Sequence, residues 1–428
     1  MEIYLVGGAV RDALLGLPVQ DRDWVVVGST PEEMTALGYL PVGKDFPVFL
    51  HPDTREEYAL ARTERKTARG YRGFAIHADP SVTLAQDLMR RDLTINSIAL
   101  PASHTSADGT KSFTTADREA LIDPCGGQID LQTRVLRHVT DAFREDPVRI
   151  LRLARFAARF HDFSVDPGTA VLMQQMVADG EVDTLVPERV WQELARGLMA
   201  KQPSRMLTVL RDCGALRQLL PEVDRLWGVP HRTDDHPEID TGVHLLRVLD
   251  MAAQLNAPLT VRFACLCQNL GRAVTPADAP LRLAANEVAS ARLLQGVCER
   301  WRVPADSREL ADLVAREHSN IHRSAALNAE AVVRLLERCD AFRKPARFAE
   351  ALLAGECDAR SRGSLPGSQD APYPHHPQRP QLMAALTAAQ GVATQPIAEA
   401  AQAAGHQGPK IGELIHAARV QAVAAAAA

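Results

Sequence analysis

The sequence has no run of about 18 apolar residues, and it opens without a basic segment followed by a hydrophobic one. A membrane-spanning helix needs the first feature and a secretory signal needs the second, so we expect the protein to stay in the cytoplasm. Its seven cysteines are odd in number, scattered, and without a Cys-x-x-Cys pair. This usage does not indicate a disulfide framework or a thiolate zinc site, and we expect reduced thiols in the core.

Aromatic residues are scarce, at 5% of the 428 residues, and positive charge is not in excess, because 48 Lys and Arg face 53 Asp and Glu. Few aromatic residues favour a helical chain. The net charge of −5 argues, as an average, against a nucleic-acid partner. The 46% hydrophobic and 24% charged content is typical of a globular protein and argues against wholesale disorder. The length suggests about three domains.

Short apolar segments predict a β-rich head up to about residue 140, with strands at Ile3–Val6, Trp24–Val27, Val48–Leu50, Glu57–Arg62 and Leu93–Leu100. Beyond residue 140, apolar residues three and four apart predict helices at 147–160, 187–199, 204–212, 243–255, 261–270, 287–300, 308–317 and 330–338. We therefore predict an α+β fold class, in which a head with a mixed sheet and helices precedes an all-helical body.

Three segments depart from this pattern. Residues 101–118 are rich in Ser, Thr, Ala and Asp and predict a solvated loop between two strands of the head. Residues 361–380 contain five prolines and predict a linker. The Ala-rich residues 381–428 predict one or two helices around 408–420, with a frayed end.

The first candidate motif is a strand that stops at Gly7-Gly8 and opens a short helix carrying Arg11. Glycines let the backbone approach a ligand, unpaired N–H groups at a helix start can hold a phosphate, and Arg11 adds a positive charge. Because Gly-Gly turns are common, a purely structural turn is an equal alternative.

The second motif is Asp21-Arg22-Asp23 at the start of an apolar strand. Alternation along a strand points Asp21 and Asp23 to the same side, about 6.6 Å apart along the chain. Two carboxylates on one face repel unless a cation lies between them, and hard oxygen ligands suit magnesium, the ion of in-line nucleotidyl transfer. The alternative is a solvated acidic edge.

The third motif, Arg90-Arg91-Asp92, lies at a helix-to-strand transition, and its arginines suit phosphate or sugar oxygens. The alternative is surface pairing of these arginines with Asp87 and Asp92.

The fourth motif runs from Asp146 through Pro147 to Arg149 and Arg152. Asp146 and Pro147 suit the cap and first position of a helix, which is a sufficient structural role. Residues three apart also share a helix face, so Asp146 and Arg149 place an acceptor beside a donor. That pair matches the Watson–Crick edge of cytosine or adenine and has the wrong polarity for guanine and uracil.

Together, in this order, the four motifs resemble those of bacterial class II tRNA nucleotidyltransferases, the CCA-adding enzymes of the polymerase-β-like superfamily. The resemblance implies that Gly8 and Arg11 contact nucleotide phosphates, that Asp21 and Asp23 are catalytic and hold Mg²⁺, and that Arg91 contacts the nucleotide.

The same resemblance implies that Asp146 and Arg149 select CTP and then ATP, with Arg152 alongside. It places a mobile loop at residues 65–73, and it leaves the third metal carboxylate open between Glu57 and Glu64. It also implies that tRNA is the partner, extended from CTP and ATP with release of pyrophosphate.

Residues 225–320 resemble the HD phosphohydrolase domain of long members of this family. His236 and His244 fit its pattern, but the expected His-Asp pair is replaced by Gln268-Asn269, and neutral amides are poor metal ligands. We expect a degenerate HD-like domain that serves as scaffold, in which His236, His244, His318 and His322 are core or surface histidines.

The resulting division is a nucleotidyltransferase head at 1–140, a helical neck and body at 141–224, an HD-like domain at 225–360, and a linker with a helical tail at 361–428. Two alternatives stay open. A poly(A) polymerase is disfavoured because Gly7 leaves no room for an N-terminal extension and no strongly basic tail follows. A non-catalytic tRNA-binding scaffold is disfavoured because the motif residues are intact.

The local distribution of charge weakens the argument that the net charge of −5 makes against a nucleic-acid partner. Each of the windows 55–72, 137–160 and 187–217 carries six basic and three acidic residues. These windows follow the nucleotide motifs and the helices beyond them, where a tRNA acceptor arm would have to lie.

Overall fold

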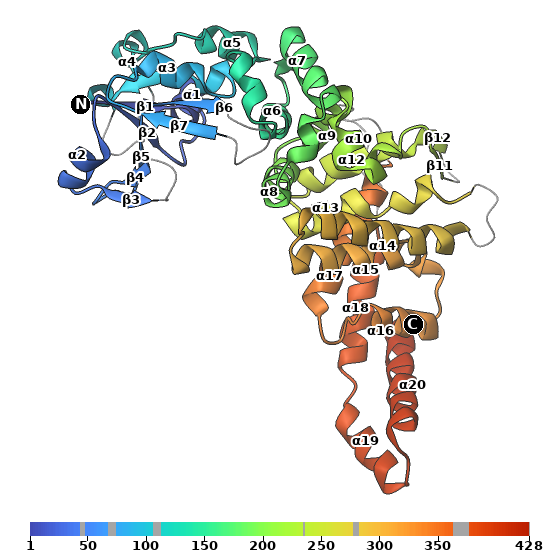
Figure 1. Cartoon of the computed structure of the whole chain (residues 1–428). Coiled ribbons are helices and arrows are strands. Elements are labelled where there is room, and N and C mark those ends of the chain that lie inside the picture. Colours follow the sequence, from blue (N-terminus) through green and yellow to red (C-terminus); the bar gives the residue numbers. More distant parts are fainter. Residues whose placement is uncertain are drawn as a thin grey trace. The chain divides into compact units, whose positions relative to one another are not determined.

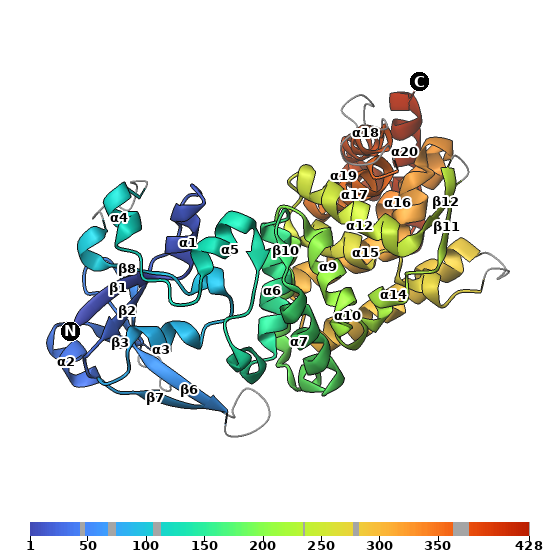
Figure 2. The ribbon, with the colours of Figure 1, turned by 90° about the horizontal axis from the view of Figure 1, so that it is seen from above.

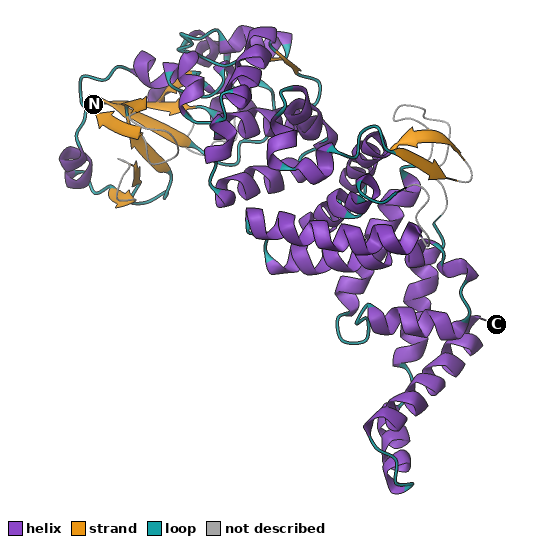
Figure 3. Cartoon of the chain, turned by 45° about the vertical axis from the view of Figure 1, so that its right-hand side comes forward, coloured by secondary structure: helices purple, strands orange, loops and turns teal. Residues whose placement is uncertain are grey.

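The computed structural model describes residues 1–42, 48–66, 74–105, 113–233, 236–276, 282–362 and 376–427. The chain divides into two compact units. The first comprises Met1–Glu193 with Thr208–Gln218, and the second comprises Leu194–Leu207 with Leu219–Ala428. Strands gather in the first part of the chain, and helices make up most of the rest (Figure 3). The predicted α+β class is confirmed.

A six-stranded sheet forms the centre of the first unit, in the order β3-β4-β5-β2-β1-β8 (Figure 1). Its strands are β1 (Glu2–Val6), β2 (Asp23–Val27), β3 (Leu40–Val42), β4 (Val48–Leu50), β5 (Glu57–Leu60) and β8 (Ala99–Pro101). Neighbouring strands are antiparallel except β2 and β5, which are parallel. A mixed sheet of this kind agrees with the predicted head.

The helices of the first unit surround this sheet and continue beyond it. They are α1 (Gly8–Leu14), α2 (Pro31–Ala36), α3 (Leu84–Met89), α4 (Thr115–Glu119), α5 (Gly127–Thr133), α6 (Val148–Arg159), α7 (Pro167–Ala178), α8 (Pro187–Leu198), α9 (Pro203–Asp212) and α10 (Ala215–Leu219). Short 3₁₀ turns lie at Thr94–Asn96, Ala102–His104, Asp141–Glu145 and Glu181–Thr184. The boundary between the two units falls within α8, α9 and α10.

One face of the sheet packs against α3. Side-chain alternation directs Val6 and Val25 to this face, where they form a buried cluster with Leu84 and Leu88 of α3. Alternation also puts Asp23 on this same face, at the start of β2. The buried contacts of Leu84 and Leu88 therefore hold α3 against the same sheet face that carries Asp23.

A hairpin of β6 (Arg62–Lys66) and β7 (Phe74–Ala78) forms a separate two-stranded sheet that extends from the head (Figure 2). Of the predicted loop at 65–73, only Arg65 and Lys66 are described, and they lie in β6; residues 67–73 lie outside the described part. A parallel bridge joins β9 (Val135–Leu136) and β10 (Ser164–Val165).

The second unit is a stack of helices with one hairpin, β11 (Pro230–Thr233) and β12 (His236–Asp240). Its helices are α11 (Pro221–Asp224), α12 (Thr241–Gln254), α13 (Leu259–Cys267), α14 (Arg282–Trp301), α15 (Ala305–His322), α16 (Ala329–Arg338), α17 (Pro345–Arg360), α18 (Gln378–Gln390), α19 (Thr394–Ala403) and α20 (Gly408–Ala427). Residues Val261–Cys267 of α13 are all buried, because α12, α15 and α17 pack around this helix. No helix among the described residues is long and apolar enough to cross a membrane.

Three predictions about segments were wrong in part. The stretch Leu93–Leu100 is a 3₁₀ turn followed by the short strand β8, because Thr94 and Ser97 hydrogen-bond locally. The expected loop at 101–118 contains α4, although 106–112 lie outside the described residues. The helix expected around 408–420 is observed as α20, but α18 and α19 precede it, so the tail has three helices instead of one or two. α18 and α20 lie side by side, and α20 continues to Ala427 where fraying was expected (Figure 1).

Candidate active site

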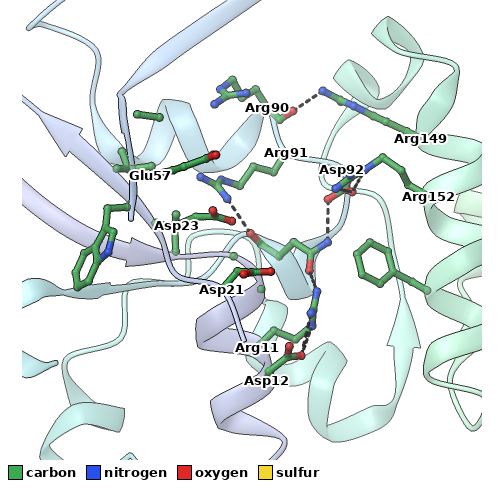
Figure 4. Close-up of a pocket in the computed structure, with 18 of the residues that line it drawn as sticks. Arg11, Asp12, Asp21, Asp23, Glu57, Arg90, Arg91, Asp92, Arg149 and Arg152 are labelled. Carbon is green, nitrogen blue, oxygen red and sulfur yellow. Dashed lines mark hydrogen bonds and ion pairs between the residues drawn. The ribbon is translucent and has the colours of Figure 1, made fainter. Parts of the chain in front are cut away.

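The ends of three central strands form one edge of the site. Val6 ends β1 opposite Asp23, the first residue of β2, and Asp23 lies in register with Glu57, the first residue of β5. In-register residues on neighbouring strands point to the same face. Glu57 therefore lies next to Asp23, and Figure 4 shows both around the same cavity with Asp21.

Asp21 precedes β2, so it is held by a loop and not by the strand that was predicted to carry both aspartates. Desolvation raises the pKa of the Asp23 carboxyl, and the charge of Asp21 adds to this effect, whereas Arg91 and Arg152 act in the opposite direction. When an acidic neighbour raises the pKa of a carboxyl group, a cation that lies between the two groups stabilises the ionised form of both. Within the described residues, no three His, Cys, Asp or Glu side chains are already gathered into a set that could hold a metal ion.

The Gly7-Gly8 turn lies against Arg91. Gly7 has φ +68°, which disfavours other residues, and a Cβ on it would lie 3.0 Å from Nη1 of Arg91. Gly8 begins α1, whose Arg11 is only 3% exposed. Arg11 donates to Asp12 and to Asn96 Oδ1, and its guanidinium lies 5.1 Å from the centre of the Phe156 ring. The two predicted phosphate contacts thus line one cavity.

Arg90 and Arg91 both pair with Asp87, at 2.7 and 3.2 Å, as the structural alternative predicted. Asp87 is fully buried, however, so the pairs are not surface pairs, and both arginines line the cavity. Burial on its own raises the pKa of the Asp87 carboxyl, but the two arginines outweigh it and lower the pKa.

Asp92 belongs to a different network, and sequence reasoning missed its role. Its carboxylate, 7% exposed, accepts from Nε of Arg152 at 2.8 Å and from Asn96 Nδ2 at 2.9 Å. Burial raises the pKa of this carboxyl, but the charge of Arg152 and the bond from Asn96 outweigh it and hold the pKa well below its usual range. Because Asn96 also accepts from Arg11, a continuous chain of hydrogen bonds joins α1 to α6 (Figure 4).

The fourth motif also lies at the cavity. α6 begins at Val148 with Pro147, and not Asp146, at the capping position. Asp146 Oδ1 nevertheless accepts from the Val148 N–H at 3.1 Å, so its side chain bonds the helix start from one residue farther out than predicted. Arg149 donates to the carbonyls of Ala142 and Arg90, at 2.7 and 2.8 Å. Asp146 and Arg149 therefore form hydrogen bonds within the protein and also line the cavity, so the structural and the nucleotide-binding roles do not exclude each other.

Arg189 was missed by sequence reasoning. It is the third residue of α8, and it binds both carboxylate oxygens of Asp146, at 3.1 and 2.6 Å. The run Pro187-Glu188-Arg189 was visible, but it resembles the ordinary start of a helix. Nothing in the sequence pairs it with a residue 43 positions earlier.

The cavity has a volume of about 640 Å³, which is the size of a small-molecule site. Nine arginines and six acidic residues line it. The arginines are Arg11, Arg62, Arg90, Arg91, Arg149, Arg152, Arg155, Arg159 and Arg189, and the acidic residues are Asp12, Asp21, Asp23, Glu57, Asp92 and Asp146. The excess of positive charge suits a polyanionic ligand, and an acidic pair at the strand ends suits a cation brought with it.

Glu64, the other candidate for a third carboxylate, lies in β6 of the separate hairpin. Its backbone pairs with Ile76 and not with a strand of the central sheet. Glu57 is therefore the carboxylate that the topology brings to the two aspartates.

A second polar cluster is buried in the helical unit around Asp358 of α17. His244 Nε2 lies 2.8 Å from its carboxylate, Gln268 donates to it at 3.0 Å, and Arg362 donates at 2.6 Å. Burial raises the pKa of Asp358, but Arg362 and His244 outweigh it and hold the pKa well below its usual range.

The remaining predicted residues of this region lie nearby or outside the described side chains. Asn269 accepts from Arg272 at 3.0 Å, and His322 lies 3.0 Å from Asp358. Burial lowers the pKa of His318 to about 4, so this histidine is neutral. His236 is in β12, and its side chain is outside the described part.

Comparison with known proteins matches the head and the helices that follow it to two family models. Residues 3–137 match the model of the poly A polymerase head domain, and residues 162–226 match the "Probable RNA and SrmB- binding site of polymerase A". The solved structure of the Bacillus stearothermophilus CCA-adding enzyme in complex with CTP is 21% identical, with a TM-score of 0.62 over 97% of this chain and 87% of that one. This likeness shows a shared fold.

Curated relatives are much more similar. The multifunctional CCA protein of Polaromonas naphthalenivorans (strain CJ2) is 68% identical over 100% of this chain and 99% of its own length. The multifunctional CCA protein of Acidovorax sp. (strain JS42) is 66% identical over 99% of this chain and 96% of its own. The chain therefore belongs to the bacterial CCA-adding enzymes, nucleotidyltransferases that add C, C and A to the 3′ end of tRNA without a nucleic-acid template.

Proposed function

We propose that the cavity between the strand ends and α6 is the place where CTP and ATP are bound and where transfer to the tRNA 3′ end occurs. The observation that carries this proposal is the meeting of two opposite groups in one cavity. Asp21, Asp23 and Glu57 lie at the strand ends, whereas Asp146 and Arg149 lie at the start of α6. The three carboxylates suit a metal ion at the reacting phosphate, and the Asp146–Arg149 pair suits hydrogen bonds to the base.

Asp21 and Asp23 are the proposed catalytic residues and the ligands of Mg²⁺. Magnesium is commonly held by one or two carboxylates together with phosphate oxygens of the substrate, which fits a carboxylate pair that has no complete set of protein ligands around it. Held by Asp21 and Asp23, Mg²⁺ would supply activation of the 3′-hydroxyl and stabilisation of the pyrophosphate leaving group. Glu57 supplies a further negative charge at the same edge, and we assign it as the third carboxylate.

The phosphates are proposed to lie along the Gly7-Gly8 turn. Gly8 allows close approach of the backbone, while Arg11 and Arg91 provide positive charge at fixed positions. Arg152, which Asp92 holds at 2.7 Å, presents further positive charge from α6. Orientation of the nucleotide by residues that are themselves hydrogen-bonded reduces the ordering that binding would otherwise require.

Base selection is assigned to Asp146 and Arg149. Cytosine and adenine each offer an amino group beside an acceptor nitrogen, which pair with a carboxylate and a guanidinium. Guanine and uracil offer a carbonyl beside a ring N–H, so the same side chains are left with unmatched donors and acceptors. A site built for hydrogen bonding rejects such analogues strongly, because its buried polar groups stay unpaired.

A single assay tests this assignment. The protein is incubated with tRNA that lacks its 3′ end and with one nucleotide at a time; CTP should add two residues, and ATP one residue after them. Unlimited addition of A would indicate a poly(A) polymerase, and no addition would indicate a tRNA-binding scaffold. Asp21→Ala or Asp23→Ala should abolish transfer while tRNA binding is kept. Asp146→Ala should relax discrimination against GTP and UTP, and unchanged selectivity would refute its role.

Transfer RNA is the proposed partner in the cytoplasm, and the basic windows 55–72, 137–160 and 187–217 are its proposed contacts. Binding through phosphates weakens with salt. The Kd for tRNA should therefore rise steeply between 50 and 200 mM salt, and Lys or Arg to Ala changes in these windows should reduce that slope.

We also propose that residues 225–360 form an HD-like domain without phosphohydrolase activity. Gln268 donates to Asp358 and Asn269 binds Arg272, so the two side chains at the His-Asp positions are occupied within the protein. Hydrolysis of 2′,3′-cyclic nucleotides with Ni²⁺ or Mg²⁺, abolished by His244→Ala, would overturn this proposal. We expect no hydrolysis.

A further inference from the structure

Asp146 can select a base only if its carboxylate keeps one orientation before the nucleotide arrives. Its side chain is about one-fifth exposed, and it precedes α6, so α6 does not fix it by helical packing. A carboxylate that rotates freely presents any of about four acceptor directions. Something outside the motif must therefore hold it.

The described residues supply three hydrogen bonds to this carboxylate. Oδ1 accepts from the Val148 N–H and from Nη1 of Arg189, and Oδ2 accepts from Nη2 of Arg189 at 2.6 Å. Two parallel N–H···O bonds from one guanidinium fix the plane of a carboxylate, which a single point charge does not. One acceptor direction of Oδ2 is left, and this number matches the single N–H that an exocyclic amino group directs at its partner.

The position of Arg189 in the helix is electrostatically unfavourable unless a negative charge lies beside it. It lies in the first turn of α8, where the helix dipole disfavours a positive charge. The carboxylate of Asp146 compensates this cost, and Arg189 itself lines the cavity. The pair joins the start of α8 to the start of α6 across 43 residues of sequence.

From these contacts we infer that Arg189 is a specificity-determining positioning residue, which acts on the base through Asp146. The inference rests on the proposed function of Asp146. Arg189 fixes the plane of the Asp146 carboxylate through its two parallel hydrogen bonds. Loss of the fork lets the carboxylate turn, and the distinction between cytosine and uracil is weakened.

The test measures kcat and KM for CTP and for UTP on tRNA lacking its 3′ end, with the full chain. Arg189→Ala should lower the CTP-to-UTP ratio of kcat/KM by about tenfold or more, since a good bidentate contact contributes discrimination of that size. Arg189→Lys keeps the charge without the fork and should lie between wild type and Arg189→Ala. Arg300→Ala is the matched control, because Arg300 forms a partly buried ion pair with Glu222 at 2.7 Å and lies outside both the cavity and the three basic windows.

A double-mutant cycle separates the possible results. In an Asp146→Ala background, Arg189→Ala should change the ratio less than twofold, because the residue acts through Asp146. A further loss of selectivity there would show direct contact with the nucleotide and overturn the positioning role. If Asp146→Ala relaxes selectivity but neither Arg189 variant does, this inference fails and the proposed function stands. If Asp146→Ala itself leaves the ratio unchanged, the proposed function fails first. Circular dichroism identifies a variant that does not fold, in which case Arg189→Lys carries the test.

Discussion

Replacing Asp92 by Asn tests whether one buried carboxylate holds α6 against the head. The change keeps the shape of the side chain but removes its charge. The amide oxygen can still accept from the Leu93 N–H and from Asn96, so the amide nitrogen is placed against the guanidinium of Arg152. Breaking a buried ion pair costs about 3–5 kcal/mol. Arg152 is 36% exposed in its side chain, so water replaces part of what it loses. We therefore expect a loss of about 2–3 kcal/mol in the free energy of unfolding.

The pH dependence makes this prediction specific. The folded-state pKa of Asp92 is depressed, so its contribution is fully present above the unfolded value of about 3.9 and is lost as the pH falls below it. The difference between wild type and Asp92→Asn should therefore be constant from pH 7 to pH 5. Below about pH 4 it should shrink by about 1.4 kcal/mol per pH unit.

Urea unfolding followed by circular dichroism measures this difference at each pH at which the wild type is folded. Asp179→Asn is the control, because Asp179 is 57% exposed in its side chain and pairs with Arg144 at the surface. Such a pair contributes about 0–1 kcal/mol. A loss below 1 kcal/mol in Asp92→Asn at pH 7, or a difference that does not change down to pH 3, would refute the reasoning.

Three further predictions follow. Glu57→Gln should lower kcat/KM by at least about 10- to 100-fold, which is the loss seen for groups that only support metal ligands. Glu56→Gln, whose residue bonds Trp24 on the opposite face, should leave transfer unchanged, and equal effects of the two would contradict the assignment. Gly7→Ala and Gly16→Ala both place Ala at φ +68° and should each cost about 1–2 kcal/mol in thermal unfolding, but only the first should raise the KM for nucleotides, because only its Cβ meets Arg91. Asp358→Asn should lower the unfolding free energy by about 3–5 kcal/mol without changing CCA addition, and a parallel loss of transfer would show that this cluster is more than scaffold.

The helices were the most predictable part of the fold, because apolar residues recur with a clear period in segments such as 187–199, which is observed as α8. Leu93–Leu100 was taken for a strand for the opposite reason. Its apolar residues Ile95 and Ile98 are fully buried, and burial on all sides removes the alternation that separates a strand from a turn. The helix boundaries in the Ala-rich tail were not predicted for a similar reason, since a run of alanines has no hydrophobic period from which to locate the breaks between α18, α19 and α20.

In the candidate site, the linear motifs led to residues that the structure brings to one cavity, among them Asp21, Asp23 and Asp146. Each of these lies within a few residues of a strand or helix start, where spacing carries geometric meaning. Glu57 could not be chosen over Glu64 from the sequence, because the choice depends on the register of two parallel strands. Arg189 needed the tertiary structure for the same reason.

The register of β2 and β5 has a consequence for how the protein can misfold. On the face opposite the acidic residues, Trp24 and Tyr58 stack with ring centres 5.4 Å apart and planes 10° from parallel. A slip of β5 by one residue would separate these rings and turn Glu57 away from Asp23. The aromatic stack therefore favours the same register that places Glu57 beside Asp23, so a sheet paired one residue out of register would lose both contacts together.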